Sequence, residues 1–247
     1  MQLVLDSLIV NYRFYDNSAT DKYLLILPGW MCASSDWVAV AEVFSESYKV
    51  VVLDFPGFGL SSKPPSDYDI YDYVDFVLKF LGKLGIEKCV VLGHSFGGRV
   101  GTILAANHSV AEKLILVDSA GIEQKNLSVR LKQKLYFLLE PGIRLLPKPI
   151  IFFLRSLFGS DDYKDADGMR EVFVKIVNQD LLHLLPKIKT PTLVIWGDKD
   201  PQLDVAYTKI YKSRVKNSLV RIVWGAGHNP HLEKPERFVE VLKERLC

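Results

Sequence analysis

A serine lies at the centre of GHSFG, residues 93–97, which fits the pattern G-x-S-x-G. The apolar run CVVL at 89–92 precedes it and predicts a buried strand, whereas the glycine-rich segment 97–101 predicts the start of a helix. A serine on so tight a strand-to-helix turn keeps its hydroxyl exposed, and the helix N-terminus places partial positive charge beside it. Ser95 is therefore predicted to be a nucleophile that attacks a carbonyl group.

A serine hydroxyl is a poor nucleophile at neutral pH unless a general base accepts its proton. His228 follows the apolar run LVRIVW and lies at the C-terminal end of a predicted strand, where open α/β sheets form their active sites. We expect the His94 side chain to point away from the serine, His108 to end a helix at the surface, and His231 to be structural. Because His183 falls in a separate helical segment, His228 is the predicted base.

The acid that orients the base is expected between the serine and the histidine in the chain. Asp118 follows the run LILV, and Asp198 and Asp200 lie in WGDKDP after the run TLVI. Asp200 is favoured because it occupies the turn itself. Asp198 is expected to form a turn by bonding its own backbone, and Asp118, expected to cap a helix or loop, is the main rival.

Short apolar runs alternate with helical patterns along most of the chain. Runs that are apolar on both faces are typical of strands covered on both sides, and hence of a mostly parallel sheet. The predicted strands lie at 8–14, 23–29, 49–57, 88–95, 112–120, 192–198 and 219–227. A helix is predicted over 69–84, with Asp69 as its N-cap and Gly85 beyond its end, and the last helix begins at Pro235. This βαβα order predicts an α/β fold with a doubly wound sheet.

Residues 122–185 contain helical patterns but no comparable strand, and a connection this long is not a bare loop. We predict a helical lid at 122–185, inserted into a core made of residues 1–121 and 186–247. The candidates for an apolar underside that meets substrate are Leu135, Phe137, Leu138, Ile151, Phe152 and Phe153. The apolar and basic run 127–159 also fits a surface that contacts a membrane, the less favoured interpretation.

Composition narrows the class of protein. With 49% hydrophobic and 24% charged residues in 247, the chain is typical of a globular protein, and its net charge of +2 argues against nucleic acid as the main partner. Three scattered cysteines form no C-x-x-C pair, and H-E-x-x-H is absent, so neither a metal nor another cofactor is predicted. Without a signal peptide or a membrane-spanning run, a cytoplasmic location is expected. The oligomeric state is not indicated.

Five segments together resemble the α/β-hydrolase superfamily, and the resemblance covers nearly the whole chain. They are LPGWMCASSDW at 27–37, DFPGFGLSSKP at 54–64, and the segments GHSFGG, WGDKDP and GAGHNPHLEKPERF. The resemblance implies that Ser95, Asp200 and His228 form a catalytic triad. It also implies that the backbone N–H groups of Trp30 and Phe96 form the oxyanion hole.

The chain departs from the family pattern at Pro28, which replaces the usual histidine before Gly29. This change is expected to alter the packing of the loop without removing the Trp30 donor. Haloalkane dehalogenases and epoxide hydrolases of the same fold use aspartate where this chain has Ser95. The serine therefore favours a route through an acyl-enzyme intermediate.

The favoured function is hydrolysis of carboxylic esters or thioesters of small apolar acyl groups, with a small-molecule ester as partner. A carbon–carbon bond hydrolase or a lyase with the same triad is the alternative. Arg99 resembles the arginine in the Gly-Gly-Arg of menaquinone-pathway lyases, although a surface salt bridge is its expected role. A non-catalytic ligand-binding receptor on the same fold is a third class, against which the complete triad argues.

Overall fold

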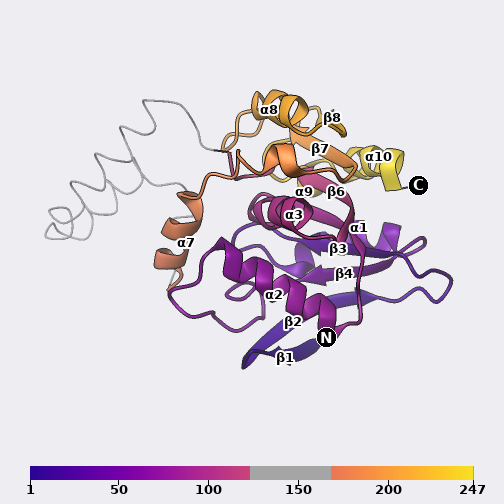
Figure 1. The fold of residues 1–247 in the computed structure, drawn as a ribbon. Coiled ribbons are helices and arrows are strands. Elements are labelled where there is room, and N and C mark those ends of the chain that lie inside the picture. The colour runs from indigo at the N-terminus through magenta and orange to yellow at the C-terminus, as the bar shows by residue number, and fades with distance from the viewer. Residues whose placement is uncertain (123–167, 247) are drawn as a thin grey trace, which may run out of the picture.

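The computed structural model describes residues 1–122 and 168–246, which build an eight-stranded sheet in the order β1-β2-β4-β3-β5-β6-β7-β8 (Figure 1). The strands are β1 Gln2–Leu5, β2 Leu8–Tyr15, β3 Tyr23–Leu27, β4 Lys49–Leu53, β5 Cys89–His94, β6 Ala111–Val117, β7 Thr192–Gly197 and β8 Ser218–Val223. The two edge pairs β1–β2 and β2–β4 are antiparallel, and every pair from β4 through β3 to β8 is parallel. The predicted doubly wound, mostly parallel sheet is confirmed.

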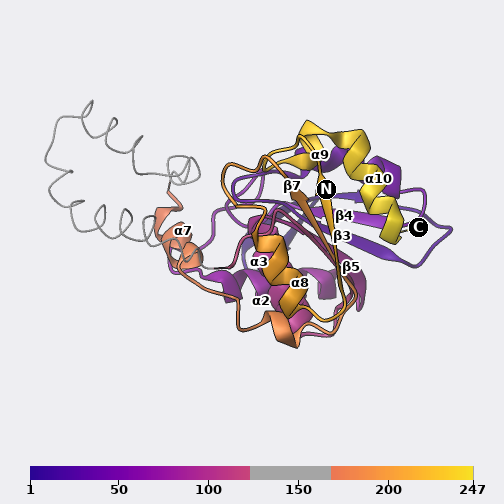
Figure 2. The same cartoon turned by 90° about the horizontal axis from the view of Figure 1, so that it is seen from above.

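The helices in the described residues cover both faces of this sheet. They are α1 Val38–Phe44, α2 Ile70–Lys83, α3 Phe96–Asn107, α7 Arg170–Val177, α8 Tyr207–Arg214, α9 Pro230–Glu233 and α10 Pro235–Leu246, with short 3-10 turns η1 Ser34–Trp37 and η2 Leu185–Lys187. Seen from above, α2, α3 and α8 lie on one side of the sheet, and α9 and α10 lie on the other (Figure 2).

The two faces of one strand explain why it is apolar throughout. Leu25 and Leu27 of β3 pack into the core beneath α2 and α3, whereas Leu24 and Ile26 pack into the opposite core, which contains α1 and α10. Successive side chains of a strand point to opposite faces, so a strand between two helical layers has no position for an exposed residue.

The predicted helix boundaries are confirmed for α2 and α10. Asp69 is the N-cap of α2 and accepts hydrogen bonds from the backbone N–H groups of Tyr71 and Asp72. Gly85 lies just beyond the helix with a φ of +69°, a conformation that glycine adopts without steric cost. The last helix begins at Pro235, as expected.

The insertion after β6 is described only where it rejoins the core. There α7 buries Val172, Phe173 and Ile176, and the chain then passes through η2 into β7. The apolar candidates Leu135, Phe137, Leu138, Ile151, Phe152 and Phe153 lie outside the described residues. The boundaries proposed for the lid, 122–185, therefore stay a prediction.

Candidate active site

Ser95 occupies the turn between β5 and α3 in a strained backbone conformation. Its φ is 48° and its ψ is −107°, and α3 begins at the next residue, Phe96. A positive φ is uncommon for a residue with a Cβ and is found where the surrounding structure holds it. The glycines of the motif permit the turn, because a Cβ on Gly93 would collide with the Gly97 backbone and one on Gly97 would collide with Leu27.

A chain of hydrogen bonds links Ser95 to a histidine and an aspartate that lie more than 100 residues further along the sequence. The Nε2 atom of His228 lies 3.0 Å from Ser95 Oγ. Its other ring nitrogen, Nδ1, lies 2.7 Å from Asp200 Oδ2. The side chain of His228 is largely buried. The structure thus brings together the three residues that the sequence singled out.

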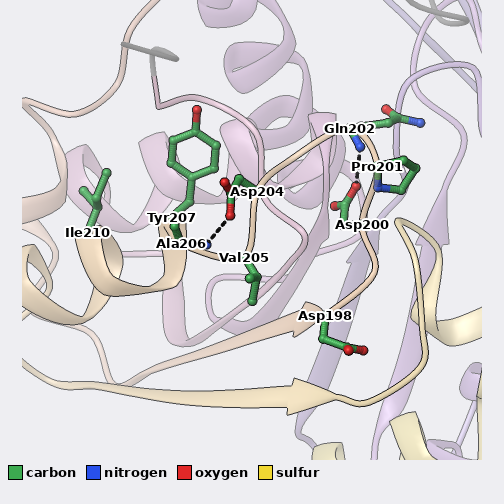
Figure 3. Close-up of a pocket in the computed structure, with 9 residues that line it drawn as sticks. All are labelled: Asp198, Asp200, Pro201, Gln202, Asp204, Val205, Ala206, Tyr207 and Ile210. Atoms are coloured by element: carbon green, nitrogen blue, oxygen red, sulfur yellow. Dashed lines mark hydrogen bonds between the residues drawn. The ribbon is translucent and has the colours of Figure 1, made fainter. Parts of the chain in front are cut away.

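Asp200 is held on its other side by its own turn. Its Oδ1 atom accepts a hydrogen bond from the backbone N–H group of Gln202 at 2.7 Å (Figure 3) and another from that of Leu203 at 3.0 Å. Burial alone would raise the pKa of Asp200, but the hydrogen bond and charge of His228 and these two N–H groups lower it below its ordinary value. Asp200 is therefore a carboxylate that can stabilise an imidazolium ion.

The two other candidate acids have different partners from those expected. The expectation that Asp198 bonds its own backbone is wrong, because its Oδ1 atom accepts from the N–H of Gly225 in the loop after β8. Asp118 is not a helix or loop cap. It is buried at the end of β6, and its Oδ1 atom accepts from the N–H of Gly197 at the end of β7, at 2.9 Å.

His94 and His231 form the buried support behind the catalytic candidate His228. The His94 Nε2–H group donates to the backbone carbonyl of His228 at 2.8 Å, and the ring of His231 stacks on Trp37 with 3.9 Å between centroids. Burial is the main cause that lowers the pKa of His94 well below its ordinary value and lowers that of His231 to about 3. His231 is thus structural, as expected.

Replacing His231 with phenylalanine should make the protein less sensitive to acid. A histidine that stays neutral when folded but is protonated when unfolded contributes stability above pH about 6.5, and this stability is lost as the pH falls toward 3. Between pH 6 and 4, the free energy of unfolding of His231→Phe should therefore fall less steeply, by about 1.4 kcal/mol per pH unit.

Urea unfolding at a series of pH values measures this slope. The phenylalanine ring suits the site because it can stack on Trp37 as the imidazole does. His94, whose pKa is lowered in the same direction, is present in both proteins and cancels in the comparison. Equal slopes for the two proteins would mean that His231 is already protonated in the folded state.

His108 and His183 are exposed side chains, in keeping with the choice of His228.

Two backbone N–H groups beside Ser95 fit an oxyanion hole. Within the described residues, neither the Trp30 N–H nor the Phe96 N–H donates to an acceptor. The loop that carries Trp30 is fixed to α3, because the carbonyl of Pro28 accepts from the N–H of Gly97 at 3.0 Å. The buried carboxylate of Asp54 also holds this region by accepting from the N–H of Ser34. Pro28 therefore leaves the loop anchored.

The indole ring of Trp30 is enclosed by aromatic side chains from three separate elements. Its centroid lies 4.9 Å from that of Phe58, 5.5 Å from that of Phe96 and 5.0 Å from that of Phe173. Phe173 belongs to α7, so the end of the insertion contacts the residue whose N–H is the candidate oxyanion donor. The surroundings of the Trp30 side chain are therefore strongly apolar.

Arg99 is not the surface residue that the sequence suggested. Its side chain is 8% exposed, and its guanidinium group donates to the backbone carbonyls of Ile176, at 3.0 Å, and Gln179, at 2.9 Å. These carbonyls lie at and just beyond the end of α7, where a helix leaves acceptors without partners. Arg99 therefore joins α3 to the end of the insertion, and the expected surface salt bridge is wrong.

A pocket of about 460 Å³ opens next to the candidate triad acid and is lined by residues of the loop after β7 and of α8 (Figure 3). Asp198, Asp200 and Asp204 contribute three carboxylates to it. Each already accepts a backbone N–H, that of Asp204 coming from Ala206. Through these bonds all three carboxylates stabilise the loop, and Asp200 in addition bonds His228.

None of the helices in the described part of the chain has the length and apolar character that crossing a bilayer requires.

The fold, with a serine on the turn after β5 and a histidine and an aspartate beside it, defines an α/β hydrolase. A sequence profile of the alpha/beta hydrolase family matches residues 24–241, and the chain belongs to that family.

The proteins that this chain resembles include a lipase and a phospholipase. A monoacylglycerol lipase of Xenopus laevis, abhd6-A, is 26% identical over 96% of this chain and 80% of its own length. A solved bacterial membrane phospholipase A superposes with a TM-score of 0.79 at 26% identity, covering 99% of this chain and 84% of that one. A meta-cleavage product hydrolase from Pseudomonas fluorescens has the same fold, with a TM-score of 0.74 at 17% identity over 99% of this chain and 97% of its own.

Proposed function

We propose that this protein is a serine hydrolase that cleaves carboxylic esters of apolar acyl groups through an acyl-enzyme intermediate. The observation that carries the proposal is the continuous path from Ser95 Oγ to His228 Nε2, at 3.0 Å, and from His228 Nδ1 to Asp200 Oδ2, at 2.7 Å. These distances are within hydrogen-bonding range, so a nucleophile, a base and an orienting acid are connected before substrate arrives.

Each group has one role in the proposed reaction. Ser95 Oγ attacks the ester carbonyl while His228 Nε2 accepts its proton, and Asp200 stabilises the imidazolium ion that forms. The N–H groups of Trp30 and Phe96 donate to the tetrahedral oxyanion. His228 then returns the proton to the departing alcohol, and water attacks the acyl-enzyme by the same route in reverse to release the acid.

The proposed substrate class rests on the surroundings of Trp30 and on the relatives. The rings of Phe58, Phe96 and Phe173 surround the side chain of Trp30, the residue that carries the proposed oxyanion donor, with apolar groups, which favours a hydrocarbon acyl chain over a charged one. Relatives named as a monoacylglycerol lipase and a phospholipase A support a fatty acyl ester. The proposal also includes the position of the insertion at 122–185, which covers Ser95 as a lid. The enzyme is proposed to be cytoplasmic and to act on small-molecule esters.

A substrate panel tests the proposal. The purified protein is assayed with p-nitrophenyl acetate and octanoate, a monoacylglycerol, an acyl thioester and a vinylogous 1,5-diketone, and a fluorophosphonate probe reports whether Ser95 becomes labelled. Turnover of the oxygen esters with labelling of Ser95 supports the proposal. Turnover of the diketone alone would indicate the carbon–carbon bond hydrolase, and neither turnover nor labelling would indicate a binding protein.

The Phe173 side chain is expected to influence which acyl group is accepted. Replacing Phe173 with alanine removes the ring that contacts Trp30 and enlarges the apolar space beside the oxyanion donor. Methylene groups in such a pocket contribute about 1–3 kcal/mol each. The ratio of kcat/KM for octanoate to that for acetate should therefore change by about tenfold, favouring octanoate.

Val177 provides the matched control, since it ends the same helix but is largely exposed. Val177→Ala should leave the octanoate-to-acetate ratio unchanged, and both variants should react with a small fluorophosphonate at the wild-type rate. An unchanged ratio in Phe173→Ala would place the acyl pocket away from α7.

A further inference from the structure

Asp118 lies directly behind the candidate triad acid and is enclosed by protein. Its side chain is 0% exposed, and its backbone has a φ of 41°, a strained value for a residue with a Cβ. The Oδ1 atom accepts from the N–H of Gly197 at 2.9 Å. The Oδ2 atom has no donor within the described residues. One ligand atom each from Asp118, Asp200 and His228 lie within 4.8 Å of one another.

Two buried carboxyl groups this close cannot both be ionised without a large electrostatic cost, which favours a proton on one of them. Asp200 accepts hydrogen bonds from three N–H groups, those of Gln202, Leu203 and His228, which favour its charged form. Asp118 accepts one. The proton therefore belongs to Asp118.

The electrostatic environment of Asp118 agrees with this choice. The pKa of Asp118 is raised to about 9, mainly by burial; the charge and hydrogen bond of Asp200 and the charge of Glu233 contribute to the increase, whereas the N–H of Gly197 opposes it. A carboxyl group with such a pKa keeps its proton at neutral pH. Its Oδ2 atom has no hydrogen-bond partner within the described residues and lies close enough to the Asp200 carboxylate to donate a proton to it.

We infer that Asp118 is a positioning residue: a neutral carboxylic acid that donates its proton to the Asp200 carboxylate and fixes that carboxylate facing His228. The inference deepens the proposed function, on which it rests. Asp200 lies in a partly exposed loop, whereas Asp118 ends a buried strand that is hydrogen-bonded to β7. The donated hydrogen bond therefore couples the loop that carries Asp200 to the interior of the sheet.

An asparagine at position 118 imitates the protonated acid. Its Nδ2–H group can donate to Asp200 and its Oδ1 atom can accept from Gly197, so Asp118→Asn should keep kcat within about twofold of wild type. Asp118→Ala loses the donor and should lower kcat about tenfold at unchanged KM, as expected for loss of a hydrogen bond to a charged group. The recovery from alanine to asparagine separates a donor from a residue that only fills space.

Infrared spectroscopy tests the proton directly and does not depend on activity. At neutral pH the wild-type protein should show a carboxylic-acid C=O stretch, which ionised carboxylates lack, and this band should be missing from Asp118→Asn. The inference is overturned if no such band is lost, or if Asp118→Asn lowers kcat as much as Asp118→Ala does. Failure of the proposed function would instead appear as absent labelling of Ser95, with the infrared band still present.

Discussion

Ser95→Ala is expected to abolish ester hydrolysis while leaving the fold intact. Without Oγ, no group stands 3.0 Å from His228 Nε2 to attack the carbonyl. Loss of the nucleophile of a triad costs about 10⁵-fold or more in kcat, because the remaining members act only through it. Measurements of kcat with p-nitrophenyl octanoate, together with a melting curve, check both parts of this prediction. An alanine variant that kept a tenth of the wild-type activity would exclude Ser95 as nucleophile.

Ser95→Gly is the matched variant, because it removes the same oxygen and also the Cβ. Glycine adopts a φ of 48° without the steric cost that serine and alanine incur. We therefore expect the glycine variant to be as inactive as the alanine variant but more stable, by about 1 kcal/mol. Equal stabilities would show that the turn stores little strain.

The sheet could be predicted because its strands are buried on both faces. Strands such as β4 and β5 have no polar position along their apolar runs, so their pattern is readable from the sequence alone. The edge strand β1 was missed. It has four residues, of which only Leu5 is buried. It turns into β2 through Asp6 and Ser7, which have positive φ values although they are not the Asn-Gly pair that predicts such a turn.

The three residues of the candidate triad could be predicted from the sequence, but the hydrogen-bond partners of the residues around them could not. Ser95, Asp200 and His228 each follow a strand at the same edge of the sheet, which is a property of the sequence order. The bonds of Asp198 to Gly225, of Arg99 to Ile176 and of Asp118 to Gly197 join segments about 27 to 79 residues apart. Nothing in the local sequence pattern distinguishes these distant partners from solvent.

Asp200→Asn is expected to lower kcat about 10³-fold to 10⁴-fold. Two N–H groups, from Gln202 and Leu203, point at Oδ1 of Asp200 and require an oxygen there. An asparagine must therefore present its Nδ2–H group to His228. The Nδ1 atom of His228 would then accept instead of donate, and its proton would move to Nε2, which faces Ser95. A protonated Nε2 cannot accept the proton of the serine hydroxyl.

The comparison with Asp198→Asn and Asp118→Asn makes this prediction specific to Asp200. At position 198 an asparagine keeps the Oδ1 acceptor that Gly225 uses, so kcat should stay close to wild type. At position 118 an asparagine keeps both the acceptor for Gly197 and a donor toward Asp200. The kcat of Asp200→Asn with p-nitrophenyl octanoate is therefore expected to lie about 10³-fold below those of the other two variants. An asparagine closely imitates a protonated Asp118 but cannot replace an ionised one. If Asp118→Asn were instead the most damaging variant, Asp118 at the end of β6 would be the ionised acid that orients His228.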